Sequence, residues 1–451
     1  MTNNSPDVLI IGGGVAGLAA AVDCSSHGLS VLLVEQKPRL GGRTHSFIHQ
    51  ETGNEVDNGQ HVMMGCYHST LKFLKLIDRL DRVEIQKNLS ITFRRSSQRP
   101  STLAAVGLPA PLNVLVGLLR LHTISFSERL SLFRVGLDLI LKNPDTDQHL
   151  QSITVAQWLD EMKQPSANKK YLWDIIAIGA LNDVTDKISA SLFVKVLKSV
   201  FFGKKMNSSI VIPKCGLSTV LVDGASEYIQ QRKGRILLKT SITKIEYLNS
   251  TIQNIHLDNG EVISPKTVIS AVPYFDISKL FDNPENIGLK NLDKFVSSPI
   301  ISIHLWFDVH FMQEQFVALI DSPIHWVFNK SKIYGKEHER LMYLSLVISG
   351  AHDTIEMTKE QLVHMAHKEL QRFYPTAAVA AIVHSLVIKE KRATFSPMVG
   401  AEQYRPSHET SVKNLFLAGD WTNTKLPATI EGAVQSGFAC GELVKRYFQH
   451  Y

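Results

Sequence analysis

Residues 8–35 read VLIIGGGVAGLAAAVDCSSHGLSVLLVE, and this stretch decides the fold. An apolar run at 8–11 is followed by three glycines, and an alanine-rich apolar segment then continues to Gly28. A second apolar run at 31–35 ends at an acidic residue. Two short apolar runs joined by a helix-length segment predict a strand–helix–strand unit in a parallel sheet that is covered on both faces.

The glycines of this unit have the spacing of a dinucleotide-binding turn. Gly12 allows the tight turn, Gly14 lets the backbone approach a pyrophosphate, and Gly17 lets helix and strand pack closely. The helix N-terminus offers free N–H groups and a partial positive charge to the phosphates. Glu35 lies 18 residues beyond Gly17, where a carboxylate can accept hydrogen bonds from an unphosphorylated ribose. The predicted dinucleotide site also includes Val15, Ala16 and Gln36.

A second glycine pair, Gly41 and Gly42, stands directly before Arg43. We expect the two glycines to allow close approach of the backbone to a phosphate, and the guanidinium of Arg43 to bind that phosphate. The alternative interpretation is an ordinary glycine turn beside a surface arginine.

The stretch GGGVAGLAAA…VLLVEQKPRLGGRTHSF resembles the N-terminal fingerprint of the FAD-dependent amine oxidase and phytoene desaturase superfamily. NLFLAGDWTNTKLPATIEGAVQSG near the C-terminus is similar to the flavin motif of that superfamily. P-x-x-G-L at 213–217, followed by KTSITKIE at 239–246, resembles its middle motif. The resemblance implies that FAD is the cofactor and that Ile242 lies beside its adenine.

The C-terminal motif carries further expectations from the same resemblance. Asp420 would meet the ribityl chain or the pyrophosphate of FAD. A helix N-terminus, whose dipole favours negative charge, would meet the flavin ring. The other cofactor-binding residues implied in this motif are Gly419, Thr429, Ile430, Glu431 and Ala433.

The stretch DNGQHVMMGC, which begins at Asp57, gathers a carboxylate, two amides and a histidine within five positions. In the superfamily this stretch lies near the flavin, so the resemblance implies that Asn58, Gly59 and Gln60 contact the cofactor. We expect Asp57 to anchor the turn, and Gln60 and His61 to face the substrate. An imidazolium at His61 would serve as a general acid. The alternative for His61 is a half-buried histidine satisfied by a backbone carbonyl.

Three stretches resemble the hydroxysqualene dehydroxylases of bacterial hopanoid biosynthesis, also called squalene-associated FAD-dependent desaturases. They are residues 55–74, 175–197 and 419–437, and carotenoid desaturases share the last of them. The resemblance covers nearly the whole chain and is weakest over 300–390. It implies net reduction of an allylic C30 alcohol, hydroxysqualene, to squalene. The hydroxyl would leave as water, and reduced flavin would deliver hydride to the allylic cation.

Other functions remain open on the same fold. A carotenoid or phytoene-type desaturase would introduce double bonds instead of removing oxygen. A non-catalytic lipid escort would have lost flavin chemistry, and the intact glycine and AGD motifs argue against it. An amine oxidase is disfavoured, because residues 391–400 and 420–424 do not contain the paired aromatic residues of an amine cage.

The predicted fold class is α/β. A Rossmann-like FAD-binding domain of the glutathione-reductase type is interleaved with an α+β substrate domain, because the glycine-rich start and the AGD-containing end belong together. The predicted FAD-binding domain comprises residues 1–75, 205–285 and 405–451. The predicted substrate and membrane-facing domain comprises residues 76–204 and 286–404.

Charge and cysteine content exclude several classes of function. The 451 residues carry a net charge of +6, with no concentrated basic patch for nucleic acid. Four scattered cysteines without metal spacing predict reduced thiols, no metal site and a cytoplasmic location. The apolar stretch 103–119 contains two prolines, which disfavour a spanning helix. With Arg120, Arg129 and Arg134 it predicts a lipid-admitting opening that binds peripherally to the inner face of the membrane.

A carbocation requires a dry, apolar tunnel, and residues 103–141, 171–202 and 300–307 offer material for one. Aromatic rings in these stretches would stabilise a cation through their faces, although each also fits ordinary core: Phe126, Phe133, Trp173, Phe193, Phe201, Phe202 and Trp306. The substrate implied is a C30 isoprenoid lipid, with functional coupling to the synthases of the squalene pathway. The sequence leaves the electron donor open.

Overall fold

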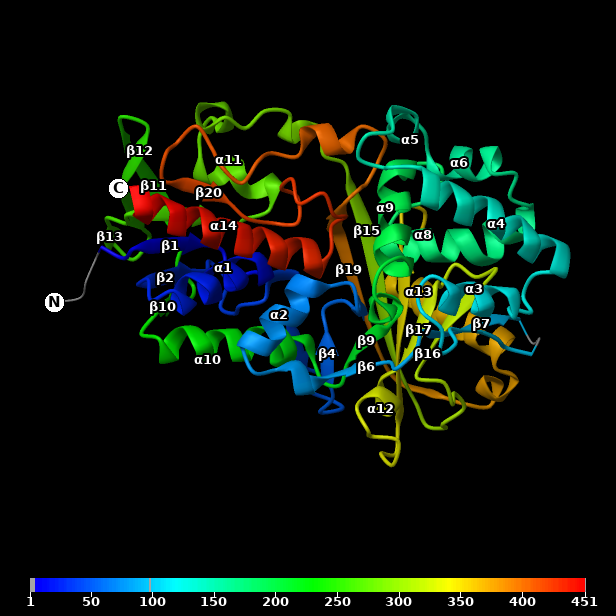
Figure 1. The fold of residues 1–451 in the computed structure, drawn as a ribbon. Coiled ribbons are helices and arrows are strands. Elements are labelled where there is room, and N and C mark those ends of the chain that lie inside the picture. The colour runs from blue at the N-terminus through cyan, green and yellow to red at the C-terminus, as the bar shows by residue number, and fades with distance from the viewer. Residues whose placement is uncertain (1–4, 97–98, 451) are drawn as a thin grey trace.

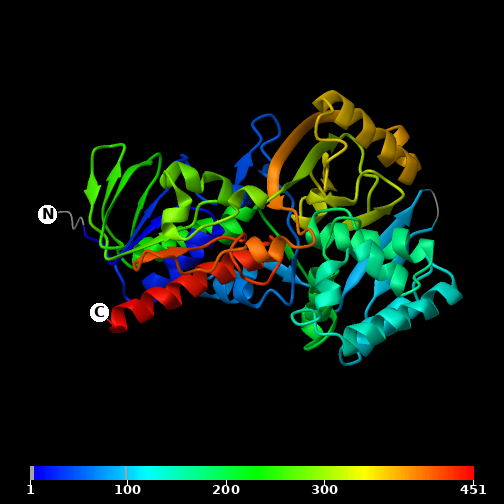
Figure 2. The ribbon, with the colours of Figure 1, turned by 90° about the horizontal axis from the view of Figure 1, so that it is seen from above.

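The computed structural model describes residues 5–96 and 99–450, so the two ends of the predicted FAD-binding domain, residues 1–4 and 451, lie outside it. Figures 1 and 2 show an elongated molecule with both termini at one end. The start and the end of the chain build the half that holds the termini together with residues 224–280, and most of the rest of the chain builds the other half.

A five-stranded parallel sheet forms the core of the half that holds the termini. Its strands lie in the order β10, β2, β1, β14, β20. Their bounds are β1 Val8–Ile11, β2 Val31–Val34, β10 Arg235–Leu237, β14 Thr267–Ser270 and β20 Leu415–Leu417. Helix α1 (Val15–Ser26) joins β1 to β2, so the predicted strand–helix–strand unit is confirmed. Strands from three distant parts of the chain therefore build one sheet.

Both faces of this sheet are covered, as predicted. Val8 and Ile10 pack with α1, with α10 (Gly224–Gln231) and with the long helix α14 (Ile430–His450), which lies beside α1 in Figure 1. Leu9 and Ile11 pack on the opposite face. There they meet the antiparallel sheet of β11 (Ile242–Leu248), β12 (Thr251–Leu257) and β13 (Val262–Ile263). Alternate residues of one strand thus reach two cores, which explains its unbroken apolar run.

Short elements connect the two halves of the molecule. β3 (Ser46–Ile48) pairs with β4 (Glu55–Asp57), and β9 (Ile210–Pro213) pairs with both β5 (Met63–Met64) and β6 (Val83–Ile85). Helix α2 (His68–Leu76) packs on α14. Two further short helices are α11 (Ile277–Leu280) and α12 (Lys330–Ile333).

A seven-stranded sheet forms the core of the other half, in the order β19, β15, β18, β17, β16, β7, β8. The bounds are β7 Ser90–Arg95, β8 Ser101–Ala104, β15 Ser297–Phe307, β16 Phe316–Ile320, β17 Trp326–Asn329, β18 Met342–Ser349 and β19 Ile382–Phe395. Neighbours pair antiparallel except β16 and β7, which are parallel. Two segments 225 residues apart thus meet in one sheet, because Ala318 of β16 pairs with Phe93 of β7.

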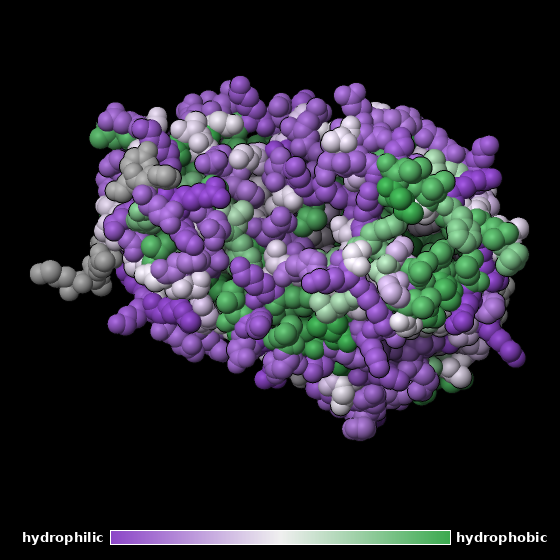
Figure 3. Space-filling view, in the orientation of Figure 1, coloured by the Kyte–Doolittle hydropathy of each residue, from purple (hydrophilic) through white to green (hydrophobic). Residues whose placement is uncertain are grey.

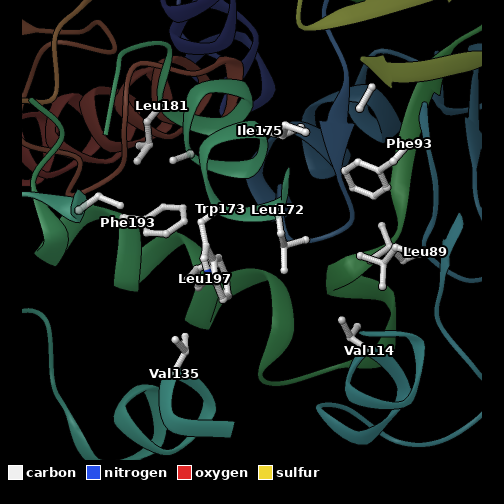
Figure 4. Close-up of a cluster of buried hydrophobic side chains, with 14 of the residues drawn as sticks. Leu89, Phe93, Val114, Val135, Leu172, Trp173, Ile175, Leu181, Phe193 and Leu197 are labelled. Atoms are coloured by element: carbon white, nitrogen blue, oxygen red, sulfur yellow. The ribbon is translucent and has the colours of Figure 1, made fainter. Parts of the chain in front are cut away.

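Helices cover both faces of the seven-stranded sheet. Helix α13 (Lys359–Phe373) packs on one face against apolar residues of β15 and β18. The other face meets a helical layer, and Figure 4 shows part of that shared core around Phe93, Trp173 and Phe193. This layer consists of α3 (Leu112–Leu119), α4 (Phe126–Leu141), α5 (Gln148–Ser152), α6 (Val155–Glu161), α7 (Ser166–Asn168), α8 (Asp174–Leu181) and α9 (Ala190–Phe201).

Candidate active site

The turn between β1 and α1 has the geometry of a phosphate-binding loop. Gly12 has a φ of +106°, and a Cβ at Gly17 would lie 2.0 Å from the carbonyl oxygen of Gly12. Gly14 is the residue before α1, and a Cβ there would meet no atom of the described residues within 4 Å. The helix therefore begins behind open space, so its first N–H groups, from Val15 and Ala16 onward, are available to an anion.

Glu35 sits at the end of β2, beside this loop. Its carboxylate is buried and accepts hydrogen bonds from the backbone N–H groups of Gly13 (2.7 Å) and Lys37 (2.8 Å). Gln36, also predicted to bind the cofactor, is exposed. Glu35 is thereby held in a fixed position next to the glycine turn, as a ribose-binding carboxylate needs to be.

The second glycine pair lies directly against the first turn. Gly41 has a φ of +96°, and its N–H donates to the carbonyl oxygen of Gly13 at 2.8 Å. Arg43 follows, and its guanidinium donates two hydrogen bonds of 2.8 Å to the two carboxylate oxygens of Asp420. The structure thus brings the two ends of the cofactor motif together, although they are 377 residues apart in sequence.

The C-terminal motif begins after β20 and leads into α14. Gly419 has a φ of +147°, and its N–H donates to the hydroxyl of Ser436 at 2.8 Å. The hydroxyl of Thr429 accepts a hydrogen bond from the N–H of Gly432 at 3.1 Å and so caps α14 at its first turn. Ile430 is buried in the core, whereas Ala433 is partly exposed.

Glu431 uses its side chain to hold another helix. Its carboxylate accepts hydrogen bonds from the N–H groups of Ser69 (2.9 Å) and Thr70 (2.8 Å) and from the Thr70 hydroxyl (2.7 Å). These donors belong to the first turn of α2, where a carboxylate also opposes the positive end of the helix dipole. Any contact of Glu431 with a cofactor would therefore use its backbone.

Ile242, predicted to lie beside the adenine, is the first residue of β11. It is partly buried and packs against the apolar core on the outer face of the parallel sheet, with Val34 of β2 in the same cluster. This places it near the edge of the sheet that carries Glu35.

A cavity of about 650 Å³ lies between the helical layer and the seven-stranded sheet. Its wall is mainly apolar, with Ile175 and Ile176 from α8, Val196 and Val200 from α9, and Leu103 from β8. One end is bounded by Gln60 and by residues of the C-terminal motif, namely Leu426, Pro427, Thr429 and Glu431. The predicted cofactor motifs therefore open onto a volume of the size that holds small-molecule ligands.

The aromatic residues of this cavity were predicted only in part. Phe201 and Phe202 line it, as expected. Five others do not line it. Trp173, Phe193 and Trp306 are ordinary core, which was the alternative for each ring, whereas Phe126 and Phe133 are exposed and match neither interpretation. Sequence reasoning missed the four rings that the sheet contributes, Phe93, Phe316, Trp326 and Phe328. Alternation of apolar and polar residues along a strand indicates that one face is buried, but it does not indicate which cavity that face meets.

His61 makes a backbone contact that bears on its predicted role as an imidazolium acid, and that role stays a prediction. Its Nδ1 donates to the carbonyl oxygen of Gly59 at 2.7 Å, and burial lowers the pKa of the ring below its ordinary value. The neutral imidazole therefore prevails near neutral pH. Among the described residues, the cavity is lined by Gln60, Val62 and Met64 but not by His61, because alternate residues of an extended segment face opposite ways. The alternative of a histidine satisfied by a backbone carbonyl matches this geometry.

A buried ion pair that the sequence did not reveal lies below this segment. Lys330, at the start of α12, places its Nζ 3.0 Å from Oδ2 of Asp57 and 2.8 Å from Oε1 of Gln60. Asp57 and Lys330 are each 1% exposed. Burial alone would raise the pKa of Asp57, but Lys330 and the N–H of Leu217 hold it below its ordinary value. No local pattern marks Lys330, because its partners lie 270 and 273 residues away.

Comparison with known proteins gives the class of this chain. Residues 15–444 match the family described as flavin containing amine oxidoreductase, so the chain belongs to that family and FAD is its cofactor. The protein is therefore a flavin-dependent oxidoreductase.

Two curated relatives and one solved structure are similar over nearly the whole chain. A hydroxysqualene dehydroxylase from Zymomonas mobilis subsp. mobilis is 27% identical, covering 96% of this chain and 98% of the relative. A 15-cis-phytoene desaturase from an Oncidium hybrid cultivar is 28% identical, covering 97% of this chain and 77% of the relative. An oxidoreductase from Methanosarcina mazei has a TM-score of 0.74 at 16% identity, covering 96% and 99% of the two chains. The predicted superfamily and fold class are confirmed.

The residues present fit FAD. Open space in front of Gly14, a fixed carboxylate at Glu35, and the joined motifs at Arg43 and Asp420 are features that a dinucleotide site needs. The residue-level assignments of cofactor contacts stay predictions. Within residues 5–96 and 99–450, no group of three or more His, Cys, Asp or Glu side chains is placed to hold a metal ion.

Proposed function

We propose that this protein is a hydroxysqualene dehydroxylase, which reduces an allylic C30 alcohol to squalene with loss of water. The observation that carries the proposal is the apolar cavity that ends at Gln60 and at the C-terminal flavin motif. A long hydrocarbon would lie along its aliphatic wall, with one end at the cofactor. When bound, FAD supplies the two-electron reduction.

The side chains of the cavity would serve this reaction in two ways. The apolar wall excludes water, which would otherwise capture an allylic cation. Ring faces of Phe93, Phe316, Trp326 and Phe328 would stabilise positive charge on the substrate through cation–π attraction. The synthase that makes such a C30 alcohol would act directly before this protein.

We propose further that the protein binds peripherally at the cytoplasmic face of a membrane and takes its lipid from there. One face of α4 consists of apolar side chains that are 45–72% exposed: Phe126, Leu130, Phe133, Leu137, Ile140 and Leu141. Figure 3 shows hydrophobic residues gathered over the half of the molecule that holds α3 and α4. Such a one-sided apolar helix is typical of interfacial membrane binding. Across the described ranges, 5–96 and 99–450, no helix has the length and apolarity to span a bilayer.

The end of this helix adjoins the substrate cavity. A second, more open cavity of about 380 Å³ is lined by Ile140 and Leu141 of α4 and by Lys198 of α9. It shares Lys195 and Ser199 with the wall of the large cavity. Of the predicted basic residues, Arg120 and Arg134 are exposed, whereas Arg129 donates to the carbonyl oxygens of Leu119 and Ile124 and so closes the α3–α4 turn.

A phytoene-type desaturase is the second candidate function, favoured by the 15-cis-phytoene desaturase relative. It would use the same cavity for a hydrocarbon and would reduce the flavin instead of oxidising it. The direction of electron transfer therefore separates the two functions.

The test is anaerobic. The purified protein is photoreduced, hydroxysqualene is added, and the 450 nm absorbance of the flavin is followed together with the extracted lipids. Return of oxidised flavin with formation of squalene supports the dehydroxylase. A flavin that stays reduced with hydroxysqualene, but bleaches when the oxidised protein meets phytoene, assigns the desaturase instead.

A further inference from the structure

Gln60 stands between the substrate cavity and the buried cation of Lys330. Its side chain lines the cavity, and its Oε1 lies 2.8 Å from Nζ of Lys330. Its Nε2 donates to the carbonyl oxygen of His61 at 3.2 Å. The amide therefore has one end directed at the cation and the other end directed along the turn that begins at Asp57.

The chemistry of lysine determines whether the oxygen or the –NH₂ group of the Gln60 amide faces Lys330. An ammonium group has three donors and no acceptor, so only the oxygen of the amide can face it. The –NH₂ group has two donors, of which the carbonyl oxygen of His61 takes one. The second N–H is left for the cavity side. A neutral partner such as serine would tolerate either orientation of the amide, whereas Lys330 permits only one.

The ammonium group of Lys330 is itself held in place by other contacts, so it stays beside the oxygen of the Gln60 amide. Its Nζ is 3.0 Å from Oδ2 of Asp57 and 4.2 Å above the ring of Tyr334. Asp57 is held in turn by the hydroxyl of Ser46 (2.7 Å) and the N–H of Leu217 (2.8 Å). Separating a buried ion pair leaves two uncompensated charges, so the pair stays together.

We propose that Lys330 is a positioning residue that makes Gln60 present an N–H donor to the cavity, so that the cavity selects an oxygenated isoprenoid over a hydrocarbon. The inference rests on the proposed function for the identity of the lipid, but the donor itself follows from the geometry alone. An alcohol oxygen accepts the hydrogen bond, whereas a hydrocarbon leaves the donor unpaired beside an apolar ligand.

The experiment measures binding without turnover. Hydroxysqualene or squalene is titrated, in the same detergent micelles, into the oxidised FAD-loaded protein, and the perturbation of the flavin absorbance gives each dissociation constant. The selectivity is the dissociation constant of squalene divided by that of hydroxysqualene. Partition of each lipid into the micelles is the same for every variant, so changes in this ratio report the protein alone. One hydrogen bond to a neutral acceptor changes this ratio by about fivefold.

Three variants and one control decide the inference. Gln60→Met removes the donor, and Gln60→Glu replaces it by acceptors that still pair with Lys330. The double variant Asp57→Asn, Lys330→Met removes both buried charges together, which avoids an unpaired charge, and frees the amide to turn. We expect the two Gln60 variants to lower the ratio about fivefold relative to the unmodified protein. The double variant should lower it by a smaller factor, because its amide keeps the donor and loses only the fixed orientation. The control Ser349→Ala removes a different polar group, a hydroxyl, from the cavity wall and should leave the ratio unchanged.

The possible outcomes separate this inference from the proposed function. If Gln60→Met keeps the full ratio, Gln60 is not the donor, whatever reaction the protein catalyses. If only the double variant keeps the full ratio, Lys330 does not orient the amide, and the proposed positioning role of Lys330 is overturned. If the ratio behaves as expected but the reduced protein does not convert hydroxysqualene, the inference stands and the proposed reaction fails.

Discussion

Gly14 and Gly17 are three residues apart, and a side chain would meet different surroundings at each. A Cβ at Gly17 would lie 2.0 Å from the carbonyl oxygen of Gly12, so helix α1 can pack on β1 only without it. A Cβ at Gly14 would enter the open space in front of the helix, where the pyrophosphate of FAD is predicted to bind. The same motif thus contains one position needed for folding and one needed for the cofactor.

The two alanine variants should therefore fail in different ways. We expect Gly17→Ala to lower the free energy of unfolding of the apoprotein by about 1–3 kcal/mol, because it overpacks a fixed contact. We expect Gly14→Ala to leave that free energy unchanged and to reduce the FAD content of the purified protein. Urea unfolding of the apoprotein and flavin absorbance per chain measure the two effects. A Gly14→Ala protein with full FAD would contradict the predicted phosphate site.

His304 is a buried histidine whose protonation opposes folding. Its Nδ1 pairs with the hydroxyl of Tyr343 at 2.8 Å, and burial lowers the pKa of its ring to about 3. In the unfolded chain His304 becomes protonated below the ordinary pKa of histidine, near 6.5. In the folded protein it stays neutral until the pH nears about 3. Stability therefore falls with decreasing pH across this window, by about 1.4 kcal/mol per pH unit for this one group.

Replacing His304 by glutamine should remove this part of the acid sensitivity. We expect the loss of unfolding free energy between pH 7 and pH 5 to be about 2 kcal/mol smaller in His304→Gln than in the unmodified protein. Urea unfolding at the two pH values provides the measurement. His325, whose pKa burial lowers to about 4, remains in the variant, so some sensitivity persists. An identical pH dependence in both proteins would refute the assignment.

At the scale of elements, α14 holds α2 in place through Glu431. The carboxylate accepts hydrogen bonds from the N–H groups of Ser69 and Thr70, so the N-terminus of one helix is capped by the first turn of another. Residues on either side of this contact, Cys66 and Tyr67 before it and Thr429 beyond it, line the substrate cavity. The cap therefore also fixes one end of the cavity wall.

Removal of this cap should loosen α2 specifically. We expect Glu431→Ala to cost about 2 kcal/mol of unfolding free energy and to speed amide hydrogen exchange in the first turn of α2, with a smaller effect for Glu431→Gln. Thr358→Ala is the matched control, because Thr358 caps α13 by an ordinary capping box. That control should speed exchange in α13 and leave α2 protected. Equal exchange in α2 for Glu431→Ala and the unmodified protein would argue against the cap.

At the scale of the whole molecule, the exposed apolar face of α4 is the surface that predicts membrane binding. The double variant Leu137→Glu, Leu141→Glu places two negative charges on it, and surface substitutions of this kind change stability little. We expect this variant to lose flotation with liposomes that contain anionic lipid, while its FAD content stays normal. Val379→Glu alters an apolar residue that is 80% exposed elsewhere and should float like the unmodified protein. Retained flotation of the double variant would exclude α4 as the binding surface.

Several features could be predicted because their signals are local. The glycine turn, α1 and the acid at Glu35 lie within 30 residues, so their spacing alone specifies a strand–helix–strand unit. The role of His61 could not be predicted in this way, because an isolated histidine has the same sequence signal whether it faces a cavity or a backbone carbonyl.

The sequence by itself determined the nucleotide-binding unit, the superfamily and the cofactor, since these depend on short motifs whose residues act as neighbours in the chain. Only the tertiary structure decided that Arg43 meets Asp420, that Glu431 caps α2, and that Lys330 pairs with Asp57 beneath Gln60. It also decided which aromatic rings line the cavity. Such contacts join residues hundreds of positions apart, and packing of whole sheets and helices, not local spacing, brings those residues together.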